Sequence, residues 1–182
     1  MTPVEYVWIT LFVVLAVVGS ARGLSRELGV STIMLLSLFA LKFGWEQVGS
    51  RITGAVGGSL PTETVMAAYY AIPLIFIAFI SYEGFSLAFP VQSMGGVGKA
   101  IFGFVGGLLN GYLIVGSIWD VVAQAEYLGL QVPYGSANTT IAIAESVTDL
   151  HNMLVQYMPI TFVDEFVMLA LGMILLLAIV LK

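Results

Sequence analysis

The side chains that could do chemistry are few and scattered along the chain. Cysteine is absent and His151 is the only histidine, which excludes thiolate catalysis, iron–sulfur clusters, thiolate zinc sites and metal sites built from several histidines. His151 lies two residues after Asp149, a pair that could suggest acid–base chemistry. Residues two apart on a helix point to different faces, however, and no recognisable motif places a nucleophile beside them. We therefore interpret the two as a solvated pair and expect a chain that is not an enzyme.

The carboxylates do not suggest a path through a membrane either. A proton relay or an ion path needs ionisable groups deep inside the membrane. Here four acidic residues fall at the ends of long apolar stretches, and none is expected at mid-depth. The chain is also too short to supply the two halves with matching broken helices of an inverted-repeat transporter. These span-end acidic residues are Glu83, Asp120, Asp164 and Glu165.

The composition indicates what surrounds these side chains. Of the 182 residues, 59% are hydrophobic and only 9% are charged, against about 25% charged in a soluble domain. So much apolar surface cannot be hidden in one core of this size, which predicts an integral membrane protein. The net charge of −5 leaves no basic surface for phosphate backbones, so nucleic acid is not an expected partner.

Uncharged apolar stretches of about 16 to 20 residues recur about five times along the chain. Each is near the length that a bilayer requires. They predict an all-α transmembrane bundle that forms a single domain over residues 1–182. The stretch Val4–Gly19 has the length of a signal peptide core, but it begins with the acidic Glu5 where a signal peptide has basic residues, and the arginines follow it, so we expect a retained span. The expected spans are about 6–21, 28–45, 65–82, 100–119 and 166–181.

The basic residues predict the orientation, because Lys and Arg near span ends are retained in the cytoplasm. Arg22, Arg26, Lys99 and Lys182 fall on one side if the N-terminus is outside and the C-terminus cytoplasmic. The loop from Val121 to Ile160 has no Lys or Arg and is then external. Within it, the apolar spacing over about 139–158 predicts an amphipathic interfacial helix, which either caps the bundle or docks a partner.

A glycine face marks the fourth span. Gly103, Gly107 and Gly111 are four residues apart, so they lie on one side of a helix where another backbone can approach closely. Asn110 adds a polar group that would prefer a hydrogen bond across a helix interface to lipid. Gly106 lies on a neighbouring face. The face indicates close packing against the first or second span, or a seam with a second copy or a partner protein.

Two segments carry a resemblance to a known family. The run R-G-L-S-R-E-L of Arg22–Leu28 follows the first span, and the run G-G-V-G-K-A-I-F-G-F-V-G-G-L-L-N-G of Gly95–Gly111 opens the fourth. In this order and spacing, residues 1–122 resemble the colicin V production protein (CvpA-like) family. The resemblance implies a bacterial inner-membrane bundle and gives weight to Arg22, Gly23, Arg26, Glu27 and Lys99 at the cytoplasmic interface.

Three functions follow as expectations. The first is a non-catalytic scaffold or accessory subunit of a larger membrane assembly, with lipids and other integral membrane subunits as partners. The second, which the family name implies, is an export- or envelope-related protein that acts as a homo-oligomer. The third is a subunit beside quinone or pigment in a respiratory or photosynthetic complex, for which Trp8, Trp45 and Trp119 offer only apolar surface. No intrinsic cofactor is expected, although lipid, quinone or pigment could be bound.

Overall fold

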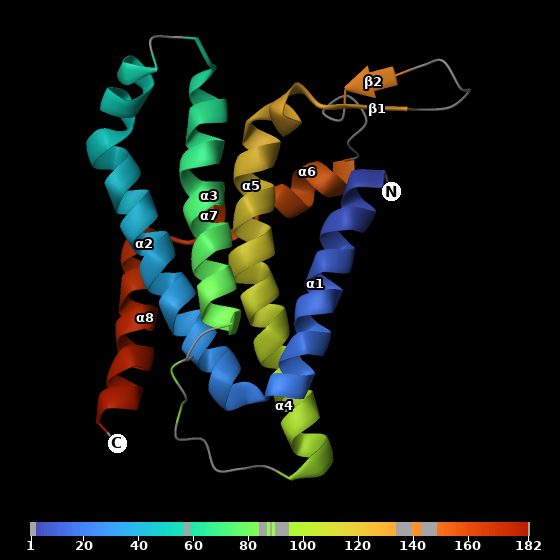
Figure 1. Cartoon of the computed structure of the whole chain (residues 1–182), viewed down its shortest axis with the longest axis vertical. Helices are drawn as coiled ribbons and strands as arrows, with labels where there is room; N and C mark the ends of the chain where they lie inside the picture. Colours follow the sequence, from blue (N-terminus) through green and yellow to red (C-terminus); the bar gives the residue numbers. More distant parts are fainter. Residues whose placement is uncertain are drawn as a thin grey trace.

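The computed structural model is an all-α bundle with one small β-hairpin (Figure 1). It describes residues 3–56, 59–83, 87, 89, 95–133, 140–142 and 149–181. The helices are α1 (Pro3–Arg22), α2 (Leu24–Ala55), α3 (Thr62–Glu83), α4 (Gly96–Gly111), the π-helix η1 (Tyr112–Gly116), α5 (Ser117–Gln124), the short turn η2 (Glu126–Gly129), α6 (Asp149–Val155), α7 (Pro159–Phe162) and α8 (Glu165–Val180). The strands are β1 (Gln131–Pro133) and β2 (Thr140–Ala142), which pair antiparallel.

The predicted transmembrane bundle is confirmed in its class. Four helices among the described residues are long and apolar enough to cross a membrane: α1, α2, α3 and the continuous rod of α4, η1 and α5. The fifth expected span corresponds to α8, whose 16 residues give about 24 Å of helix. This is shorter than the roughly 30 Å of a hydrocarbon core.

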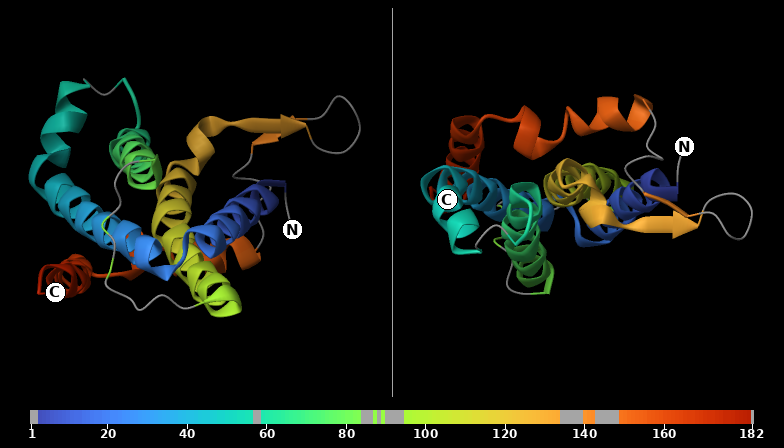
Figure 2. Two further views of the ribbon diagram at one scale, coloured as in Figure 1. Left: turned by 60° about the horizontal axis from the view of Figure 1, so that its bottom comes forward. Right: turned by 90° about the horizontal axis from the view of Figure 1, so that it is seen from above.

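The rod of α4, η1 and α5 lies at the centre of the arrangement. α1 packs along α4, α2 packs against α3, α4 and α8, and α3 packs against α5. Figure 2 shows these helices in an open row when they are seen from above, with α6 and α7 crossing one side of the row. The apolar core lies between α2, α3 and the central rod, and its fully buried side chains include Val30, Met34, Leu38, Leu74 and Val121.

The joint between α1 and α2 is much shorter than expected. Only Gly23 interrupts the helices, with a φ of 86° that glycine tolerates because it has no Cβ. α2 begins at Leu24, four residues before the expected start of the second span at residue 28. Glu27, expected in a loop, lies in the first turn of this helix.

α2 also continues ten residues beyond the expected span end at residue 45. Its last turns contain Glu46, Gln47 and Arg51, which the bilayer core would not accept. A helix satisfies its own backbone hydrogen bonds, so it can continue into water past the apolar stretch that hydropathy detects. Trp45 marks the transition and lies 5.2 Å from the ring of Tyr69 on α3.

The predicted amphipathic helix over about 139–158 is wrong in its first part. Residues Thr140–Ala142 form a strand paired with Gln131–Pro133, and the helix in this segment is only Asp149–Val155. Residues 143–148 lie outside the described part. Strand pairing with a distant segment satisfies the backbone of Thr140 and Ile141, whose branched side chains favour an extended conformation. That partner is invisible to a helical spacing pattern.

Candidate functional site

A polar cluster lies near the end of the bundle where α1 meets α2. Its centre is Glu27, which is fully buried. Arg22, the last residue of α1, directs its Nε at Glu27 Oε1 with a separation of 3.3 Å. The other carboxylate oxygen, Oε2, accepts hydrogen bonds from the Tyr82 hydroxyl at 3.0 Å and from Asn110 Nδ2 at 2.8 Å. Oε1 makes this ion pair but accepts no hydrogen bond from the described residues, so the carboxylate is hydrogen-bonded through Oε2.

Asn110 connects the cluster to the central rod. Its amide nitrogen also donates to the Glu27 carbonyl oxygen at 3.0 Å, and its Oδ1 accepts a 2.7 Å hydrogen bond from Ser31. Ser31 is one turn after Glu27 on α2, so both side chains point to the same face. Asn110 was expected to need a partner across a helix interface, and the structure places three hydrogen bonds to it on α2.

Arg22 links the cluster to α3. Its two terminal nitrogens donate to the carbonyl oxygens of Tyr82 and Ser81 at 3.3 and 3.4 Å, and its guanidinium carbon lies 4.4 Å from the centre of the Tyr82 ring. Stacking and forked hydrogen bonding are properties of Arg that Lys does not share. Of the two arginines in the Arg22–Leu28 run, Arg22 is the one that pairs with a carboxylate.

A position near the end of a span does not keep an acidic side chain exposed. Glu27 and Asp120 are each 0% exposed. Spacing along the chain placed both at span ends, and that position does not reveal whether neighbouring helices cover a side chain. Together the cluster residues join α1, α2, α3 and α4 in one hydrogen-bonded network.

The remaining residues to which the family resemblance gives weight are Gly23, Arg26 and Lys99. Arg26 and Lys99 are exposed, as expected for residues that face the membrane surface. Gly23 is buried beneath the Lys99 side chain, and a Cβ there would lie 2.9 Å from Lys99 Cε. Gly23 accepts a hydrogen bond from the backbone nitrogen of Glu27 at 3.3 Å, while the Glu27 carboxylate itself is bound by Arg22, Tyr82 and Asn110.

The glycine face of α4 packs against α1. A Cβ on Gly107 would lie 2.9 Å from Ala16 Cα, one on Gly103 would lie 3.0 Å from Gly23 Cα, and both would also collide with carbonyl oxygens of α1. Gly19 of α1 is the reciprocal small residue, since its Cβ would meet Gly107. Gly111 lies against Phe12 with a more ordinary spacing. The close contact is thus made within the chain.

Gly106, on the neighbouring face of α4, also makes a close contact. A Cβ there would be 2.7 Å from Glu27 Cβ, so this glycine makes room for the buried carboxylate. The interpretation that glycines 103, 107 and 111 form the one tight face of α4 is incomplete, because Gly106 opens a second close contact, to α2.

A second polar group secures the segment before α8. Asp120 of α5 accepts hydrogen bonds from the backbone nitrogen and the hydroxyl of Thr161, both at 2.8 Å. Lys42 of α2 donates to the carbonyl oxygens of Ile160 and Val163 at 3.1 and 3.0 Å and lies 3.5 Å from Glu165. Lys42 therefore fixes the segment that leads into α8.

A third group gathers at the end of the bundle where α1 begins. The Tyr127 hydroxyl lies 2.6 Å from His151 Nε2 and accepts a 3.0 Å hydrogen bond from Trp119 Nε1. Trp119 stacks on Trp8 with ring centres 5.7 Å apart. Glu5, which is 1% exposed, belongs to the same end of α1. The expected solvated pair of His151 and Asp149 is wrong, because His151 is 2% exposed and bonds to Tyr127.

Burial is the main cause of the pKa shifts of His151 and Tyr127. It lowers the pKa of His151 below the usual 6.5, and the charge of Glu5 opposes that shift. Burial raises the pKa of Tyr127 to about 12. At neutral pH the imidazole and the phenol are therefore both uncharged, so the pair forms a neutral hydrogen bond.

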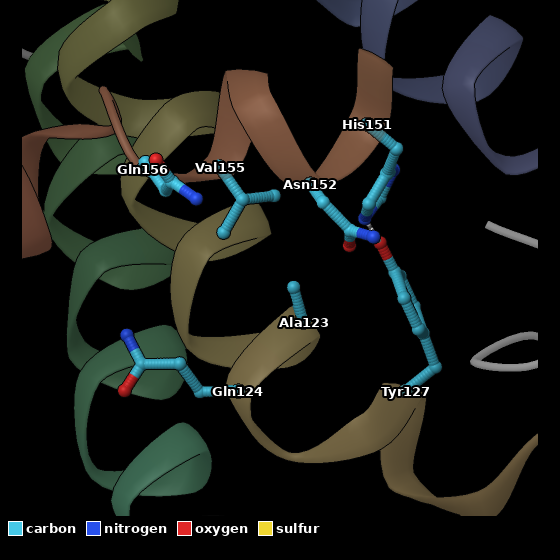
Figure 3. Close-up of a pocket in the computed structure, with 7 residues that line it drawn as sticks. All are labelled: Ala123, Gln124, Tyr127, His151, Asn152, Val155 and Gln156. Carbon is cyan, nitrogen blue, oxygen red and sulfur yellow. Dashed lines mark hydrogen bonds between the residues drawn. The ribbon is translucent and has the colours of Figure 1, made fainter. Parts of the chain in front are cut away.

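His151 and Tyr127 also line a pocket of about 470 Å³ (Figure 3). The remaining lining residues come from α5 and from the segment of α6: Ala123, Gln124, Asn152, Val155 and Gln156. Across the described residues, no group of three or more His, Asp or Glu side chains is arranged to hold a metal ion.

Several members of these groups were missed from the sequence. Ser31 had a signal, because it follows Glu27 by four residues on one helix. Tyr82, Thr161 and Tyr127 had no such signal, since each bonds to a residue on another element and no spacing along the chain relates the two. The comparisons with known proteins add no assignment: no family model, curated protein or solved structure matches the chain.

Proposed function

We propose that this chain is a non-catalytic scaffold or accessory subunit of a larger bacterial membrane protein assembly. The observation that carries the proposal is the Glu27 cluster. Its carboxylate, guanidinium and amide are engaged with one another across four helices. Groups that bond to one another across several helices stabilise one arrangement of those helices, whereas a relay or a binding site needs groups that are able to change partners.

The arrangement of the helices favours the same function. α1 and α8 lie at opposite edges of the open row, and each packs mainly on one neighbour. Their outer faces are apolar and exposed, for example at Val13 and Ile174. In a membrane these faces meet either lipid or another subunit, and an assembly would use them for helix–helix contacts.

The membrane and its orientation belong to the same proposal. We place the chain in the bacterial inner membrane with the N-terminus outside and the C-terminus cytoplasmic. The support is the resemblance of Arg22–Leu28 and Gly95–Gly111 to the CvpA-like family, together with the exposed Arg26 and Lys99 at one end of the bundle.

Photo-crosslinking in cells tests the proposal. A photoreactive amino acid at Val13 on α1 or at Ile174 on α8 should form a crosslink to another integral membrane protein, and that protein should copurify at a fixed ratio in mild detergent. Non-irradiated cells are the control. Crosslinks only between copies of this chain would support the alternative homo-oligomer. A chain that crosslinks to no protein at either edge and purifies alone would contradict the scaffold function.

A further inference from the structure

The pocket beside His151 is built by an unusual backbone turn. Glu126, Tyr127 and Leu128 have φ values of 47°, 56° and 58°, and Gly129 continues with 69°. A left-handed conformation is unfavourable for a residue other than glycine because its Cβ approaches the following carbonyl oxygen, and runs of such residues are rare. Strain of this kind persists only where other contacts hold it, and it concentrates at functional sites.

The contacts that hold the turn are those of Tyr127. The strained backbone turns its buried side chain under α6, where the hydroxyl bonds to Trp119 and His151. Figure 3 shows the side chains of Tyr127, His151 and Asn152 converging on one side of the pocket, with Gln124 and Gln156 on the other. The pocket is therefore formed by elements distant in sequence and held in place by a buried hydrogen-bond chain.

The hydrogen bonds determine which atoms remain for a ligand. The buried Tyr127 hydroxyl is already engaged with Trp119 Nε1 and His151 Nε2, so it holds the pocket wall in place and leaves the ligand contacts to the amides. Gln124 uses its amide nitrogen on Asp120 and Thr161, which leaves its carbonyl oxygen as an acceptor. Asn152 and Gln156 are exposed and present both a donor and an acceptor.

The lining selects an uncharged ligand with many hydroxyl groups. None of the seven lining residues is a carboxylate, Lys or Arg, and the only titratable ones are neutral at pH 7. Three primary amides supply donors and acceptors side by side, which matches hydroxyl groups that both donate and accept. Ala123 and Val155 provide an apolar surface for the carbon-bound hydrogens of a sugar ring. A volume of about 470 Å³ falls within the usual range for small-molecule sites.

We propose that this pocket binds an uncharged polyhydroxylated group the size of a mono- or disaccharide. The group is either a free saccharide or the glycan head of a membrane lipid, since both carry the same hydroxyl chemistry. The exposed amides of Asn152 and Gln156 bind its hydroxyls directly, and the Gln124 carbonyl oxygen accepts a hydrogen bond from one of them. This site is independent of the scaffold function, because it lies at the opposite end of the bundle from the Glu27 cluster.

His151 provides the readout, because it is the only histidine in the chain. The full-length protein is placed in phosphatidylcholine nanodiscs, which contain no sugar, and the imidazole resonance is followed by NMR. Maltose is added to one sample, and a digalactosyl lipid is built into the nanodiscs of another. A saturable shift with maltose identifies free saccharide, and a shift with the glycolipid alone identifies the lipid head group. Either result supports the proposal.

Matched variants test whether the binding occurs in this pocket. Asn152→Leu and Gln156→Leu remove an exposed amide without emptying a core, and each should weaken binding by about threefold to tenfold, the effect of one lost hydrogen bond. Gln47→Leu removes an exposed amide from α2, far from the pocket, and should leave the affinity unchanged. The proposal is overturned if neither probe shifts the resonance, if inorganic phosphate shifts it in their place, or if Gln47→Leu weakens binding as much as the pocket variants.

Discussion

Glu27 is the residue on which the packing of the bundle depends most. A buried ion pair is a weak stabiliser against an apolar alternative, but removal of one partner leaves the other without compensation. The Arg22 side chain is 14% exposed and Glu27 is not exposed at all. The cost of losing Glu27 therefore falls on a guanidinium, an amide and a phenol that were arranged around its charge.

We predict that Glu27→Gln destabilises the protein by roughly 3 kcal/mol, the lower end of the usual penalty for breaking a buried pair. The new amide nitrogen would face the donors of Arg22, Tyr82 or Asn110. Thermal unfolding in detergent measures the change. Glu83→Gln, at the exposed end of α3, is the matched control and should unfold like the parent protein. Equal melting temperatures for all three proteins would show that the cluster is not needed for the fold.

His151 allows a second prediction at the residue scale. Burial lowers its pKa below 6.5 in the folded protein, while Glu5 raises it. As the pH falls through 6.5, the unfolded chain binds a proton that the folded chain does not, so the free energy of unfolding decreases. NMR titration of this single histidine should give a pKa below 6.5, and Glu5→Gln should lower it further. A pKa above 6.5 would contradict the buried neutral pair with Tyr127.

At the scale of elements, the contact between α1 and α4 depends on backbone proximity. Gly19, Gly103 and Gly107 leave no room for a methyl group. In lipid, close packing of this kind is a main source of helix association, since the hydrophobic effect does not distinguish a neighbouring helix from lipid tails.

We predict that Gly107→Leu lowers the stability of the isolated chain, by about 1–3 kcal/mol if the helices only part locally. Gly54→Leu is the control, because a Cβ at that helical glycine meets nothing within 4 Å. Melting temperature and accumulation in the membrane are the measurements. A different outcome is a Gly107→Leu protein that is as stable as the Gly54→Leu control but has lost a copurifying partner. That result would show that the glycine face contacts another chain.

At the scale of the whole molecule, the charge distribution predicts the orientation. The α1–α2 joint and the start of α4 lie at one end of the bundle, whereas the start of α1, the α2–α3 connection and the hairpin lie toward the other (Figure 1). Arg26 and Lys99 belong to the first end. Positive charges are retained in the cytoplasm, so that end should face inward.

Two single cysteines test this orientation, since the parent chain has none. Ser59→Cys, in the α2–α3 connection, should react with a membrane-impermeant thiol reagent in intact cells. Gly95→Cys, just before α4, lies in open space and should react only after the membrane is opened. Reaction of Gly95→Cys but not Ser59→Cys in intact cells would reverse the proposed topology.

The sequence by itself determined the class of protein and the approximate positions of its long apolar helices. Apolar stretches of bilayer length report a property of each segment alone, so the membrane bundle was predictable. The same holds for the glycine spacing of Gly103, Gly107 and Gly111, because a helix places every fourth residue on one side. The Arg22–Leu28 run was also recognisable as important, although its chemistry was not.

Only the tertiary structure decided which groups meet. Whether Glu27 ends a loop or lies buried depends on α3 and α4 covering the first turn of α2, and no local pattern encodes that cover. Tyr127 and His151 likewise approach through a left-handed turn that propensity argues against. Thr140–Ala142 becomes a strand because Gln131–Pro133 supplies its hydrogen bonds. In each case the deciding energy comes from contacts between segments distant in sequence, which a spacing pattern along one segment does not contain.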